Sequence, residues 1–273
     1  DSGATLLDTA ACYDDSEELI GKFVSHRRDE YVLASKCGHV TGDASGEAWS
    51  AETISESIDR SLRLMRTDRI DLMQLHSCSK EVLAKGEAIE AVVKARDVGK
   101  VRYIGYSGDG ENALHAISMG IFATLQTSYN VVDQGARREI LPAAVAAGMG
   151  VIAKRPIANG AFGKTASPYG YADAYFDRQK SITIPDGAPN DGIELALRFT
   201  LSQDAIDTAI VGTTKLANAH ANIESLGKGP LSDSVIDSLY SHFRVALSGS
   251  SPNILFPLNS LMHKNDHCLV KYQ

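Results

Sequence analysis

Short apolar segments alternate with longer amphipathic segments along this chain, and this alternation restricts its fold more than any other feature. We identify seven such apolar segments, at residues 4–7, 31–35, 70–75, 101–107, 122–130, 151–154 and 208–212. They do not alternate polar and apolar residues, which is typical of parallel strands buried on both faces. Strands that alternate with helices indicate an α/β fold built on a parallel sheet.

Two parallel architectures fit this pattern. A chain of 273 residues has the length of a single (β/α)8 barrel. The alternative, a doubly wound sheet, normally has a G-x-G-x-x-G turn after its first strand. No such turn follows Leu7, and the glycines from Gly105 to Gly110 are spaced differently. We therefore predict a TIM (β/α)8 barrel in which about seven strands are visible.

Polar side chains follow three of the predicted strands at the points where the strands end. Asp8 follows the first strand, Lys36 the second and His76 the third, and Tyr13 comes shortly after Asp8. Taken singly, an Asp–Lys pair is more often a structural ion pair, a lone His is more often a core residue, and Tyr13 is explained by packing. The C-terminal ends of barrel strands surround the active site, however. Together, the four residues predict a catalytic site.

Helix boundaries are marked by capping residues. Ser50 and Asp191 precede amphipathic segments and are expected to cap the helices that begin there. Residues 81–98 have the apolar spacing of one continuous helix, which Gly99 closes.

The chain divides into a barrel and a tail. We expect the barrel domain to span residues 1–247 and to carry, at residues 155–189, a long loop rich in glycine, alanine, proline and aromatic residues. Residues 248–273 have no clear period and form a tail of uncertain structure.

Composition excludes several functional classes. The net charge is −7, and there is no dense run of Lys and Arg, which argues against nucleic acid or an anionic membrane as the main partner. No apolar run approaches the roughly 20 residues that span a bilayer, and no secretory leader is recognisable. The scattered cysteines indicate a reduced cytoplasmic protein without disulfides. These cysteines are Cys12, Cys37, Cys78 and Cys268.

No zinc-like spacing is present, and we expect no metal site. His263, His267 and Cys268 form the one weak grouping of possible ligands. Cys12, Cys37 and Cys78 lie close in sequence to the predicted catalytic residues, and small buried thiols at strand ends explain them.

Several of these segments together resemble the aldo-keto reductase superfamily, on its bacterial side. They keep the family's order and approximate spacing over residues 3–226. The matching pieces are Asp8-Thr9-Ala10, Tyr13, Ser16-Glu17, Leu19-Ile20-Gly21, Leu33-Ala34-Ser35-Lys36, Asp71-Leu72, Gln74-Leu75-His76, Gly99 to Gly105, Ser107, Gln126, Tyr129-Asn130, Gly150 to Ala153, and Pro156.

The resemblance implies NAD(P)H-dependent reduction of aldehydes or ketones to alcohols, with the catalytic tetrad at Asp8, Tyr13, Lys36 and His76. Tyr13 is then the general acid for the carbonyl oxygen. An ordinary tyrosine has a pKa of about 10, and a nearby ammonium such as Lys36 favours its phenolate form. Asp8 would keep Lys36 charged and in place, and His76 would donate a hydrogen bond to the carbonyl oxygen.

The resemblance also implies a nicotinamide site. Ser107 and Gln126 match the residues that hold the carboxamide, but Gly108 stands where the family usually has Asn. Lys154 occupies the position that often stacks an aromatic ring on the nicotinamide. This is a departure from the family, for which Arg155 or an aromatic residue of the loop is a possible substitute.

The adenosine-phosphate end of the cofactor is implied to lie at the start of the last helix of the series. Gly212, Thr214 and Lys215 resemble the phosphate site, where backbone N–H groups of a helix N-terminus suit an anion. Asn218 and Asn222 match contacts to the adenine. Lys215 favours NADPH over NADH if it meets a 2′-phosphate, and it is equally explained as a solvated lysine.

The expected partner is a small-molecule carbonyl substrate, with Trp49 as a wall of its site. The oligomeric state is not predicted. Aromatic residues in the loop 155–189 either line the pocket or pack within the loop.

The family barrel has a strand and helix before the strand that bears the aspartate. Here that strand starts near residue 4, so the barrel is expected to be N-terminally incomplete. A non-catalytic or weakly nucleotide-binding relative, as a truncated barrel or partner subunit, is therefore the alternative function. A lyase that uses Lys36 for a Schiff base is less well supported, because it leaves Tyr13 unexplained.

Overall fold

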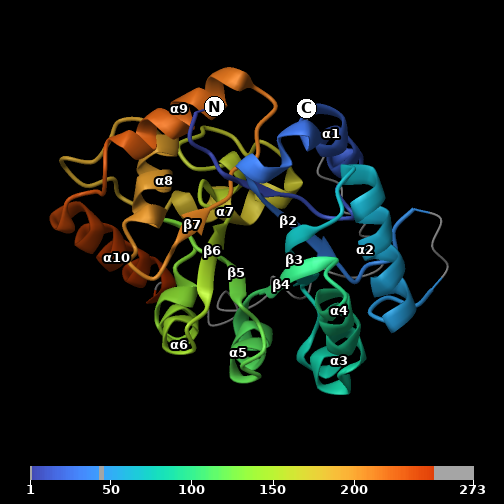
Figure 1. Ribbon diagram of the computed structural model, residues 1–273. Coiled ribbons are helices and arrows are strands. Elements are labelled where there is room, and N and C mark those ends of the chain that lie inside the picture. Colours follow the sequence, from blue (N-terminus) through green and yellow to red (C-terminus); the bar gives the residue numbers. More distant parts are fainter. Residues whose placement is uncertain (1, 43–45, 249–273) are drawn as a thin grey trace.

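The computed structural model describes residues 2–42 and 46–248. Its strands form one parallel sheet, in which they lie in the order of the sequence (Figure 1). The strands are β1 (Leu6–Asp8), β2 (Val32–Cys37), β3 (Ile70–His76), β4 (Val101–Ser107), β5 (Thr124–Ser128), β6 (Gly150–Lys154) and β7 (Thr208–Ala209).

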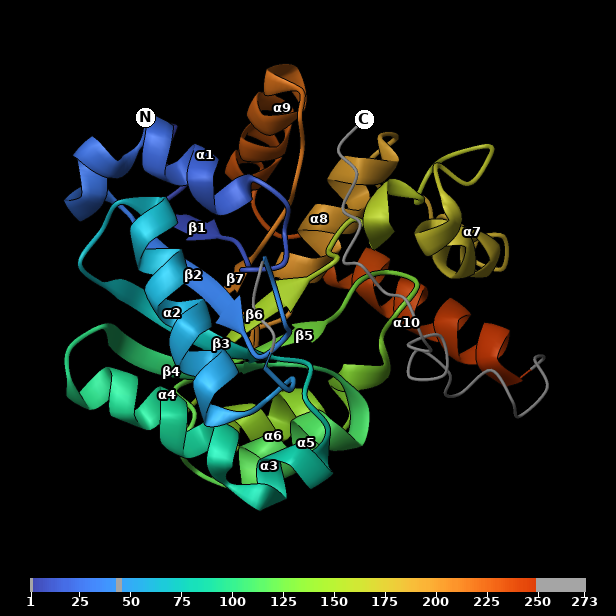
Figure 2. The ribbon, with the colours of Figure 1, turned by 90° about the vertical axis from the view of Figure 1, so that its right-hand side faces the viewer.

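The connecting helices surround the curled sheet (Figure 2). The α-helices are α1 (Ser16–Phe23), α2 (Ala51–Met65), α3 (Lys80–Lys85), α4 (Glu87–Asp97), α5 (Gly110–Ser118), α6 (Ile140–Ala146), α7 (Asp173–Gln179), α8 (Gly192–Leu201), α9 (Leu216–Gly227) and α10 (Asp233–Ser248). Short 3-10 helices are η1 (Ser25–Glu30), η2 (Gly135–Arg137), η3 (Ala158–Gly160) and η4 (Gly170–Ala172).

The sheet curls into a half-barrel, which confirms the predicted barrel architecture and its seven visible strands. Among the described residues, neighbours in the sheet follow the chain order, and no strand pairs out of sequence as a doubly wound sheet would require. The edges are β1 and β7, and no pairing joins them within the described residues.

The inside of the half-barrel is layered. Ala34, Leu72 and Ile152 form a small apolar cluster, against which Leu6 and Ile210 pack from the two edges. Successive inward positions along a strand are two residues apart. The next inward residues on β2 and β3 are Lys36 and Gln74, so the interior becomes polar towards the C-terminal ends of the strands. A larger apolar core lies between the sheet and its helices.

Close packing and caps place the first two helices. A Cβ atom at Gly21 of α1 would overlap the backbone carbonyl of Leu64, so only glycine allows this approach to α2. Ser50 caps α2 as predicted, because its hydroxyl accepts from the Thr53 N–H at 3.2 Å. Asp191 likewise caps α8.

Two predicted elements differ in the structure. The single helix expected over residues 81–98 is wrong, because Gly86 adopts φ +81° and separates α3 from α4. The loop 155–189 is not wholly irregular, since it contains η3, η4 and α7.

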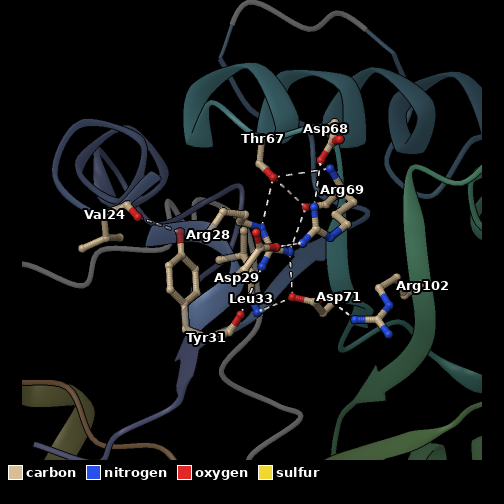
Figure 3. A network of polar contacts seen from close by, with 10 residues as sticks. All are labelled: Val24, Arg28, Asp29, Tyr31, Leu33, Thr67, Asp68, Arg69, Asp71 and Arg102. Carbon is tan, nitrogen blue, oxygen red and sulfur yellow. Dashed lines mark hydrogen bonds and ion pairs between the residues drawn. The ribbon is translucent and has the colours of Figure 1, made fainter. Parts of the chain in front are cut away.

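An ion network lies where β2, β3 and β4 begin (Figure 3). Lys36 and His76 lie near the other ends of β2 and β3. Asp71 accepts hydrogen bonds from Arg28 at 2.6 Å, the Leu33 N–H at 2.9 Å and Arg102 at 3.0 Å. Burial disfavours the charge of Asp71, but these three donors outweigh it and lower its pKa. The network ties three strands together and borders a hollow of about 300 Å³.

Candidate active site

Lys36 and Asp8 form a buried ion pair inside the half-barrel. Lys36 Nζ lies 2.5 Å from Asp8 Oδ2, and the two side chains are 1% and 5% exposed. Lys36 also donates to the Thr9 carbonyl at 2.8 Å. The other oxygen of Asp8 accepts from Gln126 at 2.8 Å and from Gln74 at 3.3 Å. The position of the ammonium is thus fixed by strands β1, β2, β3 and β5.

Tyr13 and His76 lie beside this pair. Tyr13 belongs to the turn after β1, and Lys36 Nζ lies 5.0 Å from the centre of its ring. The rings of Tyr13 and His76 meet edge-on at 5.8 Å. The structure therefore brings Asp8, Tyr13, Lys36 and His76 together at the C-terminal ends of the first three strands. Their assignment as a catalytic tetrad stays a prediction.

His76 is held as a neutral imidazole. Burial, followed by the charge of Lys36, lowers its pKa well below the ordinary value for histidine. His39 meets the His76 ring edge-on at 5.2 Å, and burial lowers the pKa of His39 as well. Two neutral imidazoles therefore stand side by side at neutral pH.

Trp49 continues this row of rings. Its indole meets His39 edge-on at 5.1 Å. Gly38 has φ +118°, and a Cβ atom there would overlap the Trp49 ring. The indole can therefore lie in this position only because residue 38 has no side chain. Trp49 is half-buried at the site, where the sequence predicts a substrate wall.

The strand register places Ser107 between His76 and Gln126. Ser107 pairs with His76 on one side and with Gln126 on the other. The Ser107 hydroxyl donates to Gln126 Oε1 at 3.1 Å, and both side chains are buried. The departure at Gly108 has a steric reason: a Cβ atom there would lie 2.5 Å from the hydroxyl oxygen of Tyr106. An asparagine does not fit without displacing that buried tyrosine.

Lys154 is paired with an acid that the sequence did not reveal. At the end of β6, its ammonium lies 3.0 Å from Asp109 Oδ2. Burial disfavours the charge of Asp109, but Lys154, Arg155 and the Ser128 N–H lower its pKa to about 2. Burial also lowers the pKa of Lys154, and Asp109 opposes this shift.

Arg155 faces hydroxyl groups. It donates to Ser128 Oγ at 3.2 Å and to the Tyr175 hydroxyl at 3.4 Å, and it contacts the Tyr171 hydroxyl. Tyr171 and Tyr175 come from the loop 155–189, so aromatic residues of that loop do reach the end of β6. Tyr175 is buried and Tyr171 is exposed.

The residues predicted for the phosphate and adenine end lie just before α9 and along its first two turns. Gly212, Thr214, Lys215 and Asn218 are exposed, and Asn222 is half-buried. Lys215 makes no ion pair with any described residue, and its N–H is held by Thr213 Oγ1 at 3.1 Å. These residues therefore lie at the surface, in contrast to the buried ion pair, and their role as a cofactor site stays a prediction.

Sequence reasoning missed His39 as a neighbour of His76 and Asp109 as the partner of Lys154. It placed Cys12 near the site but explained it as a small buried thiol, whereas Cys12 is partly exposed and contacts His76. Cys12 Sγ lies 3.5 Å from His76 Nδ1. Adjacency to Tyr13 was the one available signal for Cys12. Asp109 directly precedes α5, so the sequence alone indicates only that a helix starts there.

Across residues 2–42 and 46–248, no group of three or more His, Cys, Asp and Glu side chains is arranged to hold a metal ion. The grouping of His263, His267 and Cys268 lies outside the described residues. None of the described helices is long and apolar enough to cross a bilayer.

Comparisons with known proteins agree with this architecture. The sequence model of the Aldo/keto reductase family matches residues 1–243. An uncharacterized oxidoreductase of Bacillus subtilis, YqkF, is 28% identical over 88% of this chain and 83% of its own length. L-galactose dehydrogenase of Arabidopsis thaliana is 26% identical over 82% of this chain and 76% of its own.

A solved structure is similar as well. The holo form of an aldo-keto reductase from Bacillus halodurans superposes with a TM-score of 0.75 at 27% identity, covering 88% of this chain and 83% of the other. The family match, the relatives and the barrel geometry agree, and this chain belongs to the aldo/keto reductase family.

Proposed function

We propose that this protein is an NAD(P)H-dependent carbonyl reductase in which Tyr13 is the general acid. The observation that carries the proposal is the position of the Lys36 ammonium, 2.5 Å from Asp8 Oδ2 and 5.0 Å from the centre of the Tyr13 ring. A cation held in this way favours the phenolate form of the neighbouring tyrosine. Tyr13 then gives its proton to the carbonyl oxygen more readily and recovers it in the reverse direction.

His76 has a separate role in this proposal. Because its pKa is lowered well below the ordinary value, the ring is neutral and has one N–H to donate. Donation to the carbonyl oxygen orients the substrate and stabilises negative charge that develops there. An uncharged donor also leaves Tyr13 as the group that releases a proton.

The residues of this chain fit a nicotinamide dinucleotide. Ser107 and Gln126 carry a hydroxyl and a carboxamide, the kinds of donor and acceptor that a nicotinamide carboxamide needs. In this structure the hydroxyl donates to Gln126, and Gln126 donates to Asp8, so binding the cofactor would exchange these hydrogen bonds. Lys215, at the start of α9, is exposed and makes no ion pair with described residues, which suits a phosphate. When bound, the reduced nicotinamide supplies hydride to the carbonyl carbon. Lys215 leads us to propose NADPH rather than NADH.

Two further residues would serve the cofactor in this proposal. Lys154 is held at the end of β6 by Asp109, so it is a fixed polar contact rather than a stacking ring. Asn218 and Asn222 are four residues apart on α9 and lie on one helical face, where they would contact the adenine.

The substrate is proposed to be a small aldehyde or ketone that packs against Trp49. Two relatives bear sugar names, L-galactose dehydrogenase and D-threo-aldose 1-dehydrogenase, so aldoses belong in a substrate panel. Cys37 and Cys78 are buried and form no disulfide with any residue that the structure describes, which supports a reducing, cytoplasmic location.

The test is NADPH binding, measured by quenching of Trp fluorescence, followed by NADPH oxidation with a panel of aldehydes and aldoses. We expect binding and turnover in the wild type, and binding without turnover in Tyr13→Phe. The alternative function is a non-catalytic or weakly nucleotide-binding relative. Turnover in the wild type no faster than in Tyr13→Phe would establish that alternative instead.

A further inference from the structure

A thiol touches one of the two ring nitrogens of His76. Cys12 Sγ lies 3.5 Å from His76 Nδ1, within hydrogen-bonding distance for sulfur. Cys12 directly precedes Tyr13 in the turn after β1, whereas His76 ends β3. This contact therefore joins the turn that carries the proposed acid to the strand that carries the proposed hydrogen-bond donor.

A neutral imidazole has one N–H and exists as two tautomers. Which nitrogen carries the proton is set by the hydrogen bond that the other nitrogen makes. Burial and Lys36 keep His76 neutral, so this choice of tautomer applies to it. If the thiol donates to Nδ1, the ring proton is on Nε2. If Nδ1 carries the proton, Nε2 has none to donate.

The chemistry of the two atoms favours the first arrangement. A thiol is both a weak donor and a weak acceptor, so an N–H spent on sulfur wastes the stronger donor of the ring. If the weak S–H donates to Nδ1 instead, the stronger N–H donor remains on Nε2, where an oxygen can accept from it. The ring is also held in place. Tyr13 meets it edge-on at 78° and His39 meets it edge-on at 75°, which opposes a ring flip that would exchange the nitrogens.

We propose that Cys12 is a positioning residue whose thiol donates to His76 Nδ1 and thereby keeps the ring proton on Nε2. The Nε2–H group is then the one available to a carbonyl oxygen. The tautomer itself depends only on the contact between Cys12 and His76. Its catalytic consequence rests on the proposed carbonyl reduction.

The direct test is nitrogen NMR of the full chain labelled with ¹⁵N-histidine, with the His76 signals assigned from a His76→Asn variant. We expect the wild type to show the Nε2–H tautomer at neutral pH. Cys12→Ala should show a mixture of tautomers, and Cys12→Ser, whose hydroxyl also donates, should restore Nε2–H. A wild-type Nδ1–H tautomer, or a Cys12→Ala spectrum identical to the wild type, overturns the proposal.

Activity gives a second readout. A hydrogen bond of this kind is worth a factor of roughly two to ten, so Cys12→Ala should lower kcat and kcat/KM together by about that factor. Cys12→Ser should recover most of the loss. Cys12→Val, which replaces the volume of the thiol without a donor, should not. Equal activity in Cys12→Val and Cys12→Ser would show that the residue only fills space.

The two proposals fail in different ways. If Cys12→Ala changes the His76 tautomer in a protein that reduces no carbonyl, the proposed function is wrong and the role of Cys12 stands. If the wild type reduces carbonyls and Cys12→Ala leaves the tautomer unchanged, the role of Cys12 is wrong and the proposed function stands.

Discussion

Lys36 and Asp8 are joined at 2.5 Å in an environment that leaves their side chains 1% and 5% exposed. A buried ion pair of this kind is costly to form and more costly to break, because removing one partner leaves the other charge without compensation. The pair is therefore both a structural requirement of the half-barrel and the source of the positive charge beside Tyr13.

Asp8→Asn tests that double role. We expect it to lower the free energy of unfolding by about 3–5 kcal/mol, because the Lys36 charge is left buried. Urea denaturation measures the change. Asp68→Asn is a matched control, since Asp68 is 86% exposed in its pair with Arg69, and such a pair contributes about 0–1 kcal/mol. Equal stability of the two variants would contradict the account.

The network at the start of the strands makes stability depend on pH. The pKa of Asp71 is lowered in the folded protein, so its ionised form stabilises the fold above the ordinary carboxyl pKa, and this contribution is lost as pH falls through the folded value. Asp71→Asn should be less stable than the wild type by about 3 kcal/mol at pH 7, and the gap should narrow in acid.

Denaturation of both proteins at pH 7 and near pH 3 measures this gap. Asp59→Asn serves as the control, because Asp59 pairs with Lys100 while their side chains are 54% and 42% exposed. A gap that stays constant between the two pH values would contradict the assignment of the shift to Asp71.

The sequence predicts that His76, Ser107 and Gln126 lie at neighbouring strand ends, but it does not predict the side-chain contacts around them. Strand ends are marked by apolar runs, and parallel strands of a barrel bring those ends together. His76, Ser107 and Gln126 follow from that rule and are paired in register. Cys12 lies in a turn, and the direction of a turn side chain depends on contacts far along the chain, here with His76.

Gly86 shows the limit of periodicity. A single glycine in a helix costs only about 1 kcal/mol, so an amphipathic pattern that continues through it still predicts one helix. In the structure Gly86 adopts φ +81° and caps the C-terminus of α3, a left-handed conformation that glycine enters readily. Asp109 is similar, because the sequence places it before a helix and only the fold places Lys154 beside it.

Thiol reactivity should differ among the cysteines. Burial raises the pKa of Cys78 to about 12 and raises the pKa of Cys37 as well, so both thiols remain protonated and unreactive. Cys12 is partly exposed. In a Cys268→Ala background, iodoacetamide at pH 8 should alkylate Cys12 first, and activity should be lost at the same rate.

Peptide mapping by mass spectrometry follows this reaction over time. Cys12→Ser in the same background should keep its activity through the treatment. Modification of Cys37 or Cys78 before Cys12 would contradict the burial of those two thiols.

Replacing Gly108 by asparagine, the residue usual at this position in the family, should destabilise the protein. Because a Cβ atom would lie 2.5 Å from the Tyr106 hydroxyl, Gly108→Asn should cost about 1–3 kcal/mol of stability through overpacking. Gly227→Ala is the control, as no atom lies within 4 Å of its added Cβ. Thermal unfolding compares the two. A Gly108→Asn variant as stable as the wild type, with tighter NADPH binding, would contradict this reading.

The most direct test of the central claim, that Tyr13 is the general acid for carbonyl reduction, is single-turnover oxidation of bound NADPH by an aldehyde. Tyr13→Phe keeps the ring that packs near Lys36 and His76 and removes only the hydroxyl. Loss of a general acid typically costs about 10²- to 10⁴-fold in rate. We predict that loss with unchanged NADPH affinity. A Tyr13→Phe variant that oxidises NADPH at the wild-type rate would contradict the account.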